Sequence, residues 1–562
     1  MDYAVTIAVT MLAVTLWLQP WSYPTDGVFT LGGDIYWVQA TAEAYSRSGP
    51  IGTDSHVAWP GGYSPWGVPQ LGLLFAVLSW VLGAGLGLSS AMIVWVNLVV
   101  FAAVSAACTL YFFRGLVGDW APIMSVSLAC AMGASPFVLA KIYHINVAGF
   151  FLVPLAIGAA VSWSQSDRRR RRVAVLMCTA GGLLSPLWWV VVVIMLLGVA
   201  LLPVLVRRTW THVRGLAAVN AALLVGFGFQ TVLYQGFRVQ GALPTRLPWD
   251  SNLHGGHLVD LVLSSPLVNQ VVPRLPEVTA GASREPSYVG LVGGVGAFVV
   301  LALVIIGMPR RVVFNVDTSV LADTTVVALL LYLLGGLGNL QAAVFVVLGG
   351  ISPARVWSRL AVLLALLGLG WLLLLLAAWT SGRQARRPVR PAAFTAFAAS
   401  VAVFTALAWA GDALATPKTP PAAKETWAEY PALQYLDSVT DPCPVAQLPQ
   451  DGFPTPRFGG QLTSDLADFY YRGFVPYILA PDYSWSFGSW VPGKPGGLNA
   501  LPLRVETQHL SALADDGYCA ILFDKLLASS ATNRDDVQLE GREIVGTEPD
   551  FRSQRFDVYL LR

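Results

Sequence analysis

The sequence VAVLMCTAGGLLSPLWWVVVVIMLLGVALLPVLV, residues 173–206, has no charged side chain over 34 positions. One membrane-spanning helix needs about 20 apolar residues, so this run is long enough to cross a bilayer and return. Arginines flank it on both sides, at 168–172 and at 207–208. Positively charged loops stay in the cytoplasm, so both ends of the run face that side. We therefore expect a helical hairpin or re-entrant pair that breaks at Pro186, because proline cannot continue a helix.

Apolar runs of spanning length recur through most of the chain. They lie at about 4–20, 89–113, 120–140, 145–163, 215–234, 288–308, 319–336, 360–380 and 391–410. Hydrophobic residues make up 55% of the 562 residues and charged residues only 12%, about half the charged fraction of a soluble protein. The sequence thus predicts a polytopic α-helical membrane protein with about 11–13 membrane segments. Its few basic residues lie in short clusters, which excludes nucleic acid as a partner.

The arginine clusters also orient the loops. They place the loops at about 21–65 and 235–287 outside the cytoplasm, within a membrane domain of residues 1–411. This assignment requires that the apolar run 66–86 does not span but lies in the outer interface as a juxtamembrane helix, which prolines 65 and 69 would introduce. The alternative is that 66–86 does span and that the N-terminus lies outside.

The C-terminal part, residues 424–562, has a different composition. Residues 412–562 carry 20 acidic and 12 basic side chains, whereas 1–411 carry 13 and 23. Strand-like runs at 443–449, 519–524 and 556–561 alternate with helical patterns near 426–439 and 506–517, which predicts an extracytoplasmic α/β domain. Cys443 and Cys519 both lie in it and are candidates for a disulfide, since an extracytoplasmic compartment is oxidising.

The first external loop contains the most informative polar residue. Gly32 and Gly33 allow a tight bend, and an interfacial helix is expected to start at Asp34. This carboxylate could cap the helix, or act as a general base on a substrate that enters from the lipid. Asp54 could supply a second carboxylate or a hydrogen bond to substrate, although an exposed loop position is the simpler expectation.

This layout resembles the GT-C superfamily of membrane glycosyltransferases. A first helix is followed by an external loop with an acid near its start, a proline-bearing juxtamembrane helix, many spans and an extracytoplasmic C-terminal domain. The resemblance implies a polyprenyl-phosphate-linked sugar as donor and assigns the role of base or substrate anchor to Asp34. The chain lacks an Asp-Glu or Asp-x-Asp pair, so the resemblance assigns neither a second acid nor a metal ligand set.

The second external loop holds further substrate-binding candidates. They are Asp250, His254, His257 and Glu285. His254 and His257 are three residues apart, as metal ligands on a helix can be, but the two glycines between them disfavour a rigid helix. We expect these histidines to bind substrate hydroxyls or a phosphate. No Cys/His ligand spacing supports a divalent metal, so no cofactor is assigned.

Two basic clusters complete the candidates. Lys141 and His144 lie at the outer end of a span, where they would meet the donor phosphate or, more simply, lipid headgroups. Arg355 and Arg359 are four residues apart, on one face of a helix that would start near Pro353, and could clamp a phosphate. Headgroup binding is the alternative for them as well.

The leading hypothesis is a glycosyltransferase in a bacterial cytoplasmic membrane. It would transfer sugar from the polyprenyl-phosphate donor to an extracytoplasmic glycan or glycolipid acceptor, with inversion. The alternatives are a transporter or flippase of a lipid-linked glycan, and a non-catalytic assembly protein of the cell envelope. A transporter would depend on ionisable groups within the spans, where Asp323 is the nearest candidate.

Overall fold

The structure is a computed structural model. It describes residues 1–22, 27–29, 34–65, 71–139, 144–237, 289–309, 312–313, 316–334, 357–384, 391–415, 424–425, 430–449, 474–486, 501–502, 504–526, 528 and 543–561.

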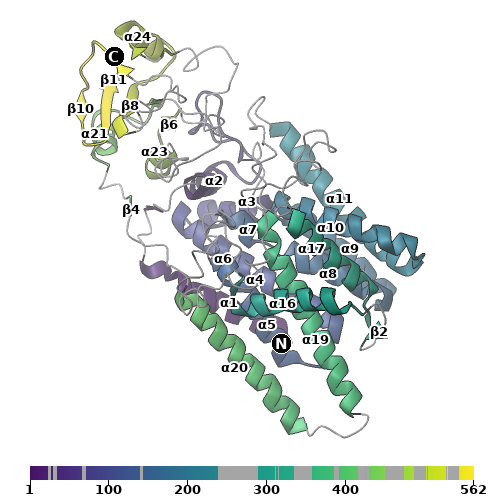
Figure 1. The fold of residues 1–562 in the computed structure, drawn as a ribbon. Coiled ribbons are helices and arrows are strands. Elements are labelled where there is room, and N and C mark those ends of the chain that lie inside the picture. The colour runs from purple at the N-terminus through teal and green to yellow at the C-terminus, as the bar shows by residue number, and fades with distance from the viewer. Residues whose placement is uncertain are drawn as a thin grey trace.

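The chain is a multi-pass membrane protein whose helices form one bundle (Figure 1). Its longer described helices are α1 (Asp2–Leu18), α4 (Ser90–Val117), α5 (Pro122–Gly133), α8 (Leu152–Ser162), α9 (Arg168–Leu184), α10 (Leu187–Val206), α11 (Trp210–Phe237), α16 (Gly290–Ile306), α17 (Ser319–Leu334), α19 (Ala361–Gln384) and α20 (Pro391–Ala415). Short helices α6 (Pro136–Leu139) and α7 (Ile145–Ala148) extend α5 and precede α8. In the described part, 7 helical stretches are long and apolar enough to cross a membrane, and α1, α16 and α17 are shorter apolar helices.

The predicted break at Pro186 is confirmed. Helix α9 ends at Leu184 and α10 begins at Leu187. The break leaves carbonyl groups at the end of α9 without partners inside the helix, which is costly away from water. The buried Nε2 of Gln230 on α11 lies within hydrogen-bonding distance of three carbonyls at this break, those of Gly182 (2.7 Å), Leu183 (3.1 Å) and Ser185 (2.9 Å), and shares its two N–H donors among them.

Glycines allow the closest helix crossings. A side chain on Gly368 of α19 would come within 1.7 Å of the Gly296 carbonyl oxygen on α16. A side chain on Gly226 of α11 would come within 2.7 Å of the backbone at Gly182 on α9. Small residues let membrane helices approach until their backbones touch, and dispersion then holds them together.

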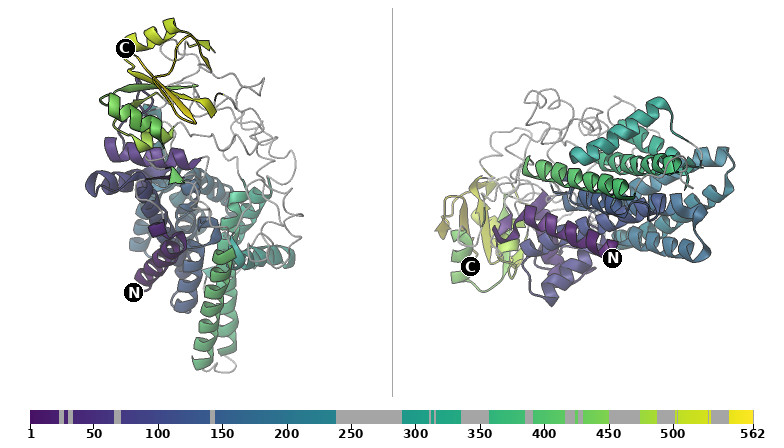
Figure 2. Two further views of the ribbon diagram at one scale, coloured as in Figure 1. Left: turned by 90° about the vertical axis from the view of Figure 1, so that its left-hand side faces the viewer. Right: turned by 90° about the horizontal axis from the view of Figure 1, so that it is seen from below.

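The bundle has an arginine end and a tail end. At the arginine end, Arg114 of α4 pairs with Asp2, the first residue of α1. Arg114 and Arg170, which belongs to the arginine run, line one pocket of about 300 Å³. The N-terminus therefore lies on the same side as the arginine run. The C-terminal residues lie at the opposite, tail end in Figure 1 and in the left view of Figure 2.

The run 66–86 contains a short helix at the tail end, close to α2 (Asp34–Ser48) in Figure 1. Helix α3 (Gly72–Trp80) continues as a π-helical turn, Val81–Gly85. At 1.5 Å per residue these segments together span about 21 Å, less than the roughly 30 Å of a bilayer core. Gly72 has φ +80° and packs against the backbone of Leu184 and Ser185, so α3 begins on the turn between α9 and α10.

The described residues from 430 onward, here called the tail, form the predicted α/β structure. Its mixed sheet has the order β10-β11-β8-β5-β6. The strands are β5 (Pro444–Leu448), β6 (Ser484–Trp485), β8 (Ala520–Asp524), β10 (Phe551–Arg552) and β11 (Phe556–Leu560). Its described helices are α21 (Pro431–Val439), α23 (Val475–Leu479) and α24 (Thr507–Asp515), and β7 (Arg504–Val505) pairs with β9 (Glu543–Ile544). A disulfide joins Cys443 to Cys519, just before the neighbouring parallel strands β5 and β8, with Cα atoms 6.2 Å apart.

The first loop adds to the edge of this sheet. The amide of Trp485 in β6 donates to the His56 carbonyl (2.8 Å), and the Trp59 amide donates to the Trp485 carbonyl (3.1 Å). Nearer the bundle, β1 (Val28–Phe29) pairs with β4 (Lys424–Glu425). Backbone pairing therefore joins the first loop to the tail at Trp485 and to the segment just before the tail at Lys424–Glu425.

Candidate functional site

The candidate site is built around α2, at the tail end. As predicted, this helix begins at Asp34. It packs against α3, α4 and α23, and nearly every residue from Ile35 to Tyr45 is buried. The expectation of an interfacial helix was therefore incomplete, because the first loop and the tail cover α2 on the side away from the bundle.

Buried hydrogen bonds hold the first half of α2. Trp37 donates its indole Nε1–H to the Tyr63 hydroxyl at 2.9 Å, and that hydroxyl lies 3.0 Å from the Thr41 hydroxyl. Burial raises the pKa of Tyr63 to about 12, so the phenol stays protonated. The Gln39 amide donates to the Gly27 carbonyl at 3.1 Å, which ties α2 to the segment just before it. The helix that begins with Asp34 is thus fixed on several sides.

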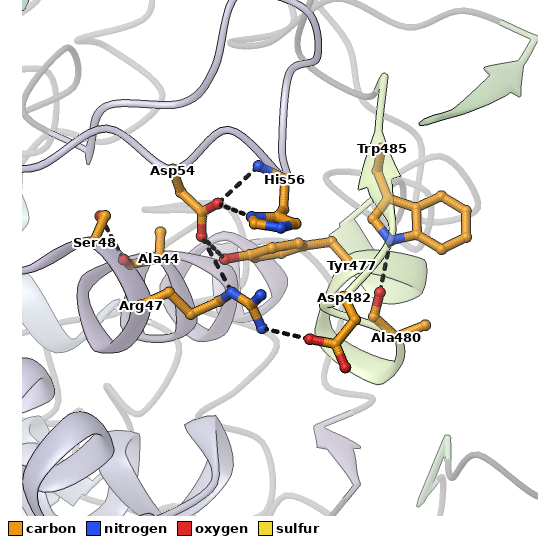
Figure 3. Close-up of polar contacts among 9 residues, drawn as sticks. All are labelled: Ala44, Arg47, Ser48, Asp54, His56, Tyr477, Ala480, Asp482 and Trp485. Atoms are coloured by element: carbon orange, nitrogen blue, oxygen red, sulfur yellow. Dashed lines mark hydrogen bonds and ion pairs between the residues drawn. The ribbon is translucent and has the colours of Figure 1, made fainter. Parts of the chain in front are cut away.

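A second set of contacts holds the C-terminal half of α2. Arg47, Asp54, His56 and Tyr477 form this cluster, here called the latch (Figure 3). One oxygen of Asp54 accepts from the His56 amide (2.8 Å) and faces His56 Nδ1 at 3.0 Å. The other oxygen accepts from the Tyr477 hydroxyl (2.7 Å), with Arg47 Nε 4.0 Å away.

Asp54 differs from the simpler sequence expectation. It is 2% exposed rather than open to water, and both of its carboxylate oxygens have protein partners. A buried carboxylate is stable only when it is hydrogen-bonded or paired, and the latch supplies both kinds of contact. Tyr477 gave no sequence signal, because it follows Asp54 by 423 positions.

Glu43 belongs to the same half of α2 and was not among the sequence candidates. Burial raises the pKa of its carboxyl group from 4.5 to about 7, and nearby Arg47 opposes the rise. Asp54 and Asp482 add to it, because they are negative charges close by. A carboxyl group that titrates near neutral pH therefore lies next to the latch.

The remaining predicted residues fall into two groups. His144 immediately precedes α7, and Arg359 lies in the 3-10 turn Trp357–Leu360; both are half-buried. The others lie outside the described residues: Lys141, Asp250, His254, His257, Glu285 and Arg355. Within the described ranges, no three His, Cys, Asp or Glu side chains are grouped closely enough to hold a metal ion.

Asp323, the carboxylate expected to matter for a transporter, is 2% exposed and has a charged partner. Arg207, at the end of α10, donates to both of its oxygens, one at 3.1 Å. The arrangement is a bidentate ion pair that joins α10 to α17.

Comparison with solved structures identifies the fold. The chain superposes on the oligosaccharyltransferase AglB of Archaeoglobus fulgidus, bound to an inhibitory peptide and a dolichol-phosphate, with a TM-score of 0.51 and 13% identity, covering 95% of this chain and 71% of that one. An Archaeoglobus fulgidus oligosaccharyltransferase in complex with zinc and sulfate gives a TM-score of 0.50 and 12% identity, covering 93% of this chain and 68% of that one. The arabinofuranosyltransferase AftD from Mycobacteria gives 0.35 and 15%, covering 93% and 35%.

No protein-family model matches the sequence, and no curated protein does. At such low identity, a structural likeness establishes the fold and leaves the reaction to be argued from the site. The chain therefore has the fold of the archaeal oligosaccharyltransferase, which agrees with the GT-C-like architecture expected from the sequence.

Proposed function

We propose that this protein is a membrane glycosyltransferase. It takes a sugar from a polyprenyl-phosphate donor and transfers it to a glycan or glycolipid acceptor on the outer side of a bacterial cytoplasmic membrane. The observation that carries the proposal is the position of Asp34: it begins a buried, firmly held helix at the tail end of a GT-C-like bundle.

Asp34 is the proposed general base. The acceptor hydroxyl oxygen attacks the anomeric carbon, and the bond from that carbon to the phosphate oxygen breaks. The electron pair leaves with the polyprenyl phosphate, and the hydroxyl proton passes to the Asp34 carboxylate. A single displacement of this kind inverts the anomeric centre. General-base help contributes about 10²–10⁴-fold to such a step.

The other sequence candidates have supporting roles in this proposal. Arg355, Arg359 and Lys141 would offset the charge that grows on the leaving phosphate. Asp250, His254, His257 and Glu285 would contact sugar hydroxyls or the phosphate, as would His144. A lipid carrier is supported by the dolichol-phosphate bound to AglB, whose fold this chain shares.

The orientation follows from charge and chemistry. Positively charged loops favour the cytoplasm, and the arginine run lies at the end opposite the tail. The Cys443–Cys519 disulfide supports an oxidising compartment for the tail. Both arguments favour a tail that faces outward, on the same side as the first loop.

The ion pair of Asp323 with Arg207 favours an enzyme over a transporter. A coupling carboxylate must exchange its cation during a transport cycle. Asp323 instead holds a fixed arginine across two helices, which gives it a structural role.

The test is sugar transfer by detergent-purified protein supplied with a panel of polyprenyl-phosphate sugars and glycan or glycolipid acceptors. Wild type is compared with Asp34→Asn and with Asp515→Asn, a control at an exposed tail position. We expect turnover by wild type and by the control with at least one donor. If the protein bound donors but transferred none of them, the proposal would be wrong.

A further inference from the structure

Tyr477 makes a buried side-chain hydrogen bond between the tail and the first loop. It lies on α23 and is fully buried. Its hydroxyl donates to Asp54 at 2.7 Å, and the same carboxylate oxygen faces Arg47 of α2 at 4.0 Å. Figure 3 shows the three side chains converging from α23, the first loop and α2. One carboxylate thus joins α2 and the first loop that follows it to α23, whose Tyr477 lies 423 positions after Asp54.

The neighbouring contact of Arg47 is of a different kind. Arg47 also donates to Asp482 at 3.1 Å, but the Asp482 side chain is 75% exposed. Exposed ion pairs contribute little, whereas a hydrogen bond to a buried charge is strong and costly to lose. Of these two contacts between the tail and the C-terminal half of α2, the Tyr477–Asp54 hydrogen bond is therefore the one expected to decide how firmly the tail holds α2.

Helix α2 transmits this restraint to Asp34. It runs without interruption from Asp34 to Ser48, so Arg47 lies about 20 Å along the axis from Asp34 at 1.5 Å per residue. A helix of this length moves as a unit, and a change of tilt at its C-terminal end displaces its first residue. Displacement of a reacting group by about 1 Å can cost about 10²-fold in rate.

We propose that Tyr477 is a positioning residue. Through Asp54 and Arg47 it fixes α2 against the tail, and so fixes the acid at the start of α2 relative to the domain that would receive the acceptor. The catalytic part of this inference rests on the proposed function, because Asp34 needs alignment only if it acts on an acceptor. The docking of α2 by Tyr477 does not depend on that function.

The chain offers a matched pair of variants. Tyr477→Phe removes only the hydroxyl and keeps the buried ring. Tyr483→Phe removes the hydroxyl of another buried tail tyrosine, which donates to the Thr440 carbonyl at 3.2 Å, a contact entirely within the tail. Hydrogen–deuterium exchange of the α2 amides is measured for both variants and for wild type, together with kcat and KM for sugar transfer.

We expect the α2 amides to exchange about tenfold faster in Tyr477→Phe, as loss of one charge-assisted hydrogen bond implies, and no change in Tyr483→Phe. We also expect kcat to fall about 10- to 100-fold in Tyr477→Phe with the donor KM unchanged. Asp54→Asn should lower kcat as well, and the double variant should lose less than the sum of the two effects, because both act through one contact.

Hydrogen–deuterium exchange tests whether Tyr477 docks α2 against the tail. The kinetics test whether this docking affects sugar transfer. Unchanged α2 exchange in Tyr477→Phe, or an equal effect of both tyrosine variants, would overturn the inference. Faster α2 exchange with unchanged kcat would overturn the positioning role. If wild type transferred no sugar, the proposed function and the catalytic link would both fail, while the exchange data would still decide the docking of α2.

Discussion

Glu43 lies one helical turn before Arg47 on the helix that also begins with Asp34. Burial is the main reason that the pKa of its carboxyl group rises to about 7. In the unfolded chain this pKa would be 4.5. The folded protein therefore binds the proton more tightly than the unfolded chain does, and stability must fall as the pH rises between these two values.

Replacing Glu43 with glutamine should remove this pH dependence. The protonated carboxyl group contributes its full stabilisation below pH 4.5, and this contribution is lost as the pH rises to about 7. The thermal midpoint of Glu43→Gln relative to that of wild type should therefore rise between pH 5 and 7. The difference between the two midpoints should then stay constant up to pH 8. The control is Glu548→Gln, at an exposed tail position. Parallel pH curves for wild type and Glu43→Gln would contradict the burial argument.

At this scale, local signals predicted the start of α2 but not its surroundings. Two glycines followed by aspartate are enough to predict a helix start at Asp34. The burial of Asp54 could not be predicted, because its cover comes from Tyr477, 423 positions later. No pattern of residues near Asp54 carries that information.

Helices α16 and α19 make the tightest described crossing in the bundle, at Gly296 and Gly368. Leucine at Gly368 would place its first side-chain atom 1.7 Å from a backbone oxygen of α16, so the helices would have to separate. Overpacking costs about 1–3 kcal/mol when the neighbouring side chains can move aside. We expect a larger cost here, because the neighbouring atom belongs to the backbone of α16. We expect Gly368→Leu to lower the yield of folded, monodisperse protein after purification in detergent, and to lower its thermal midpoint.

The control for that substitution is Gly228→Leu on α11, where an added Cβ would meet nothing within 4 Å. We expect it to be tolerated, because the site is open. Equal thermal midpoints for the two variants, measured in the same detergent, would show that the crossing of α16 and α19 is not close-packed.

At the scale of elements, the break at Pro186 was predictable because proline acts on its own helix. The glycine crossing was not, because it depends on the pairing of Gly296 with Gly368, which lie in separate spans. The use of Gln230 to satisfy the broken helix depends in the same way on how α9 and α11 pack.

The whole molecule is held together across the boundary between the bundle and the tail. Strands β5, β8 and β11 and helices α21 and α24 of the tail follow local patterns and were predicted. The backbone pairing of residues 28–29 with 424–425, and of the first loop with Trp485, was not. Strand register between distant segments is set by tertiary packing. The predicted boundary between a membrane domain (1–411) and a C-terminal domain (424–562) therefore gave no indication that the first loop pairs with the C-terminal part.

The Cys443–Cys519 disulfide closes a loop with a sequence separation of 76 residues. On the chain-entropy model such a cross-link stabilises the folded state by roughly 4 kcal/mol. We expect a reducing agent to speed proteolysis of the tail in wild type and to have no effect on the Cys443→Ser/Cys519→Ser double variant, which should be cleaved quickly throughout. Equal proteolysis of wild type with and without reductant would contradict this role.

The central claim is that Asp34 is the base of a sugar transfer from a polyprenyl-phosphate donor. The most direct measurement is single-turnover transfer by wild type and by Asp34→Asn, with the anomeric configuration of the product determined. The account predicts an inverted product from wild type and a rate about 10²–10⁴-fold lower in Asp34→Asn, with α2 exchange and thermal midpoint unchanged. Equal rates in the two proteins, or a product of retained configuration, would contradict it.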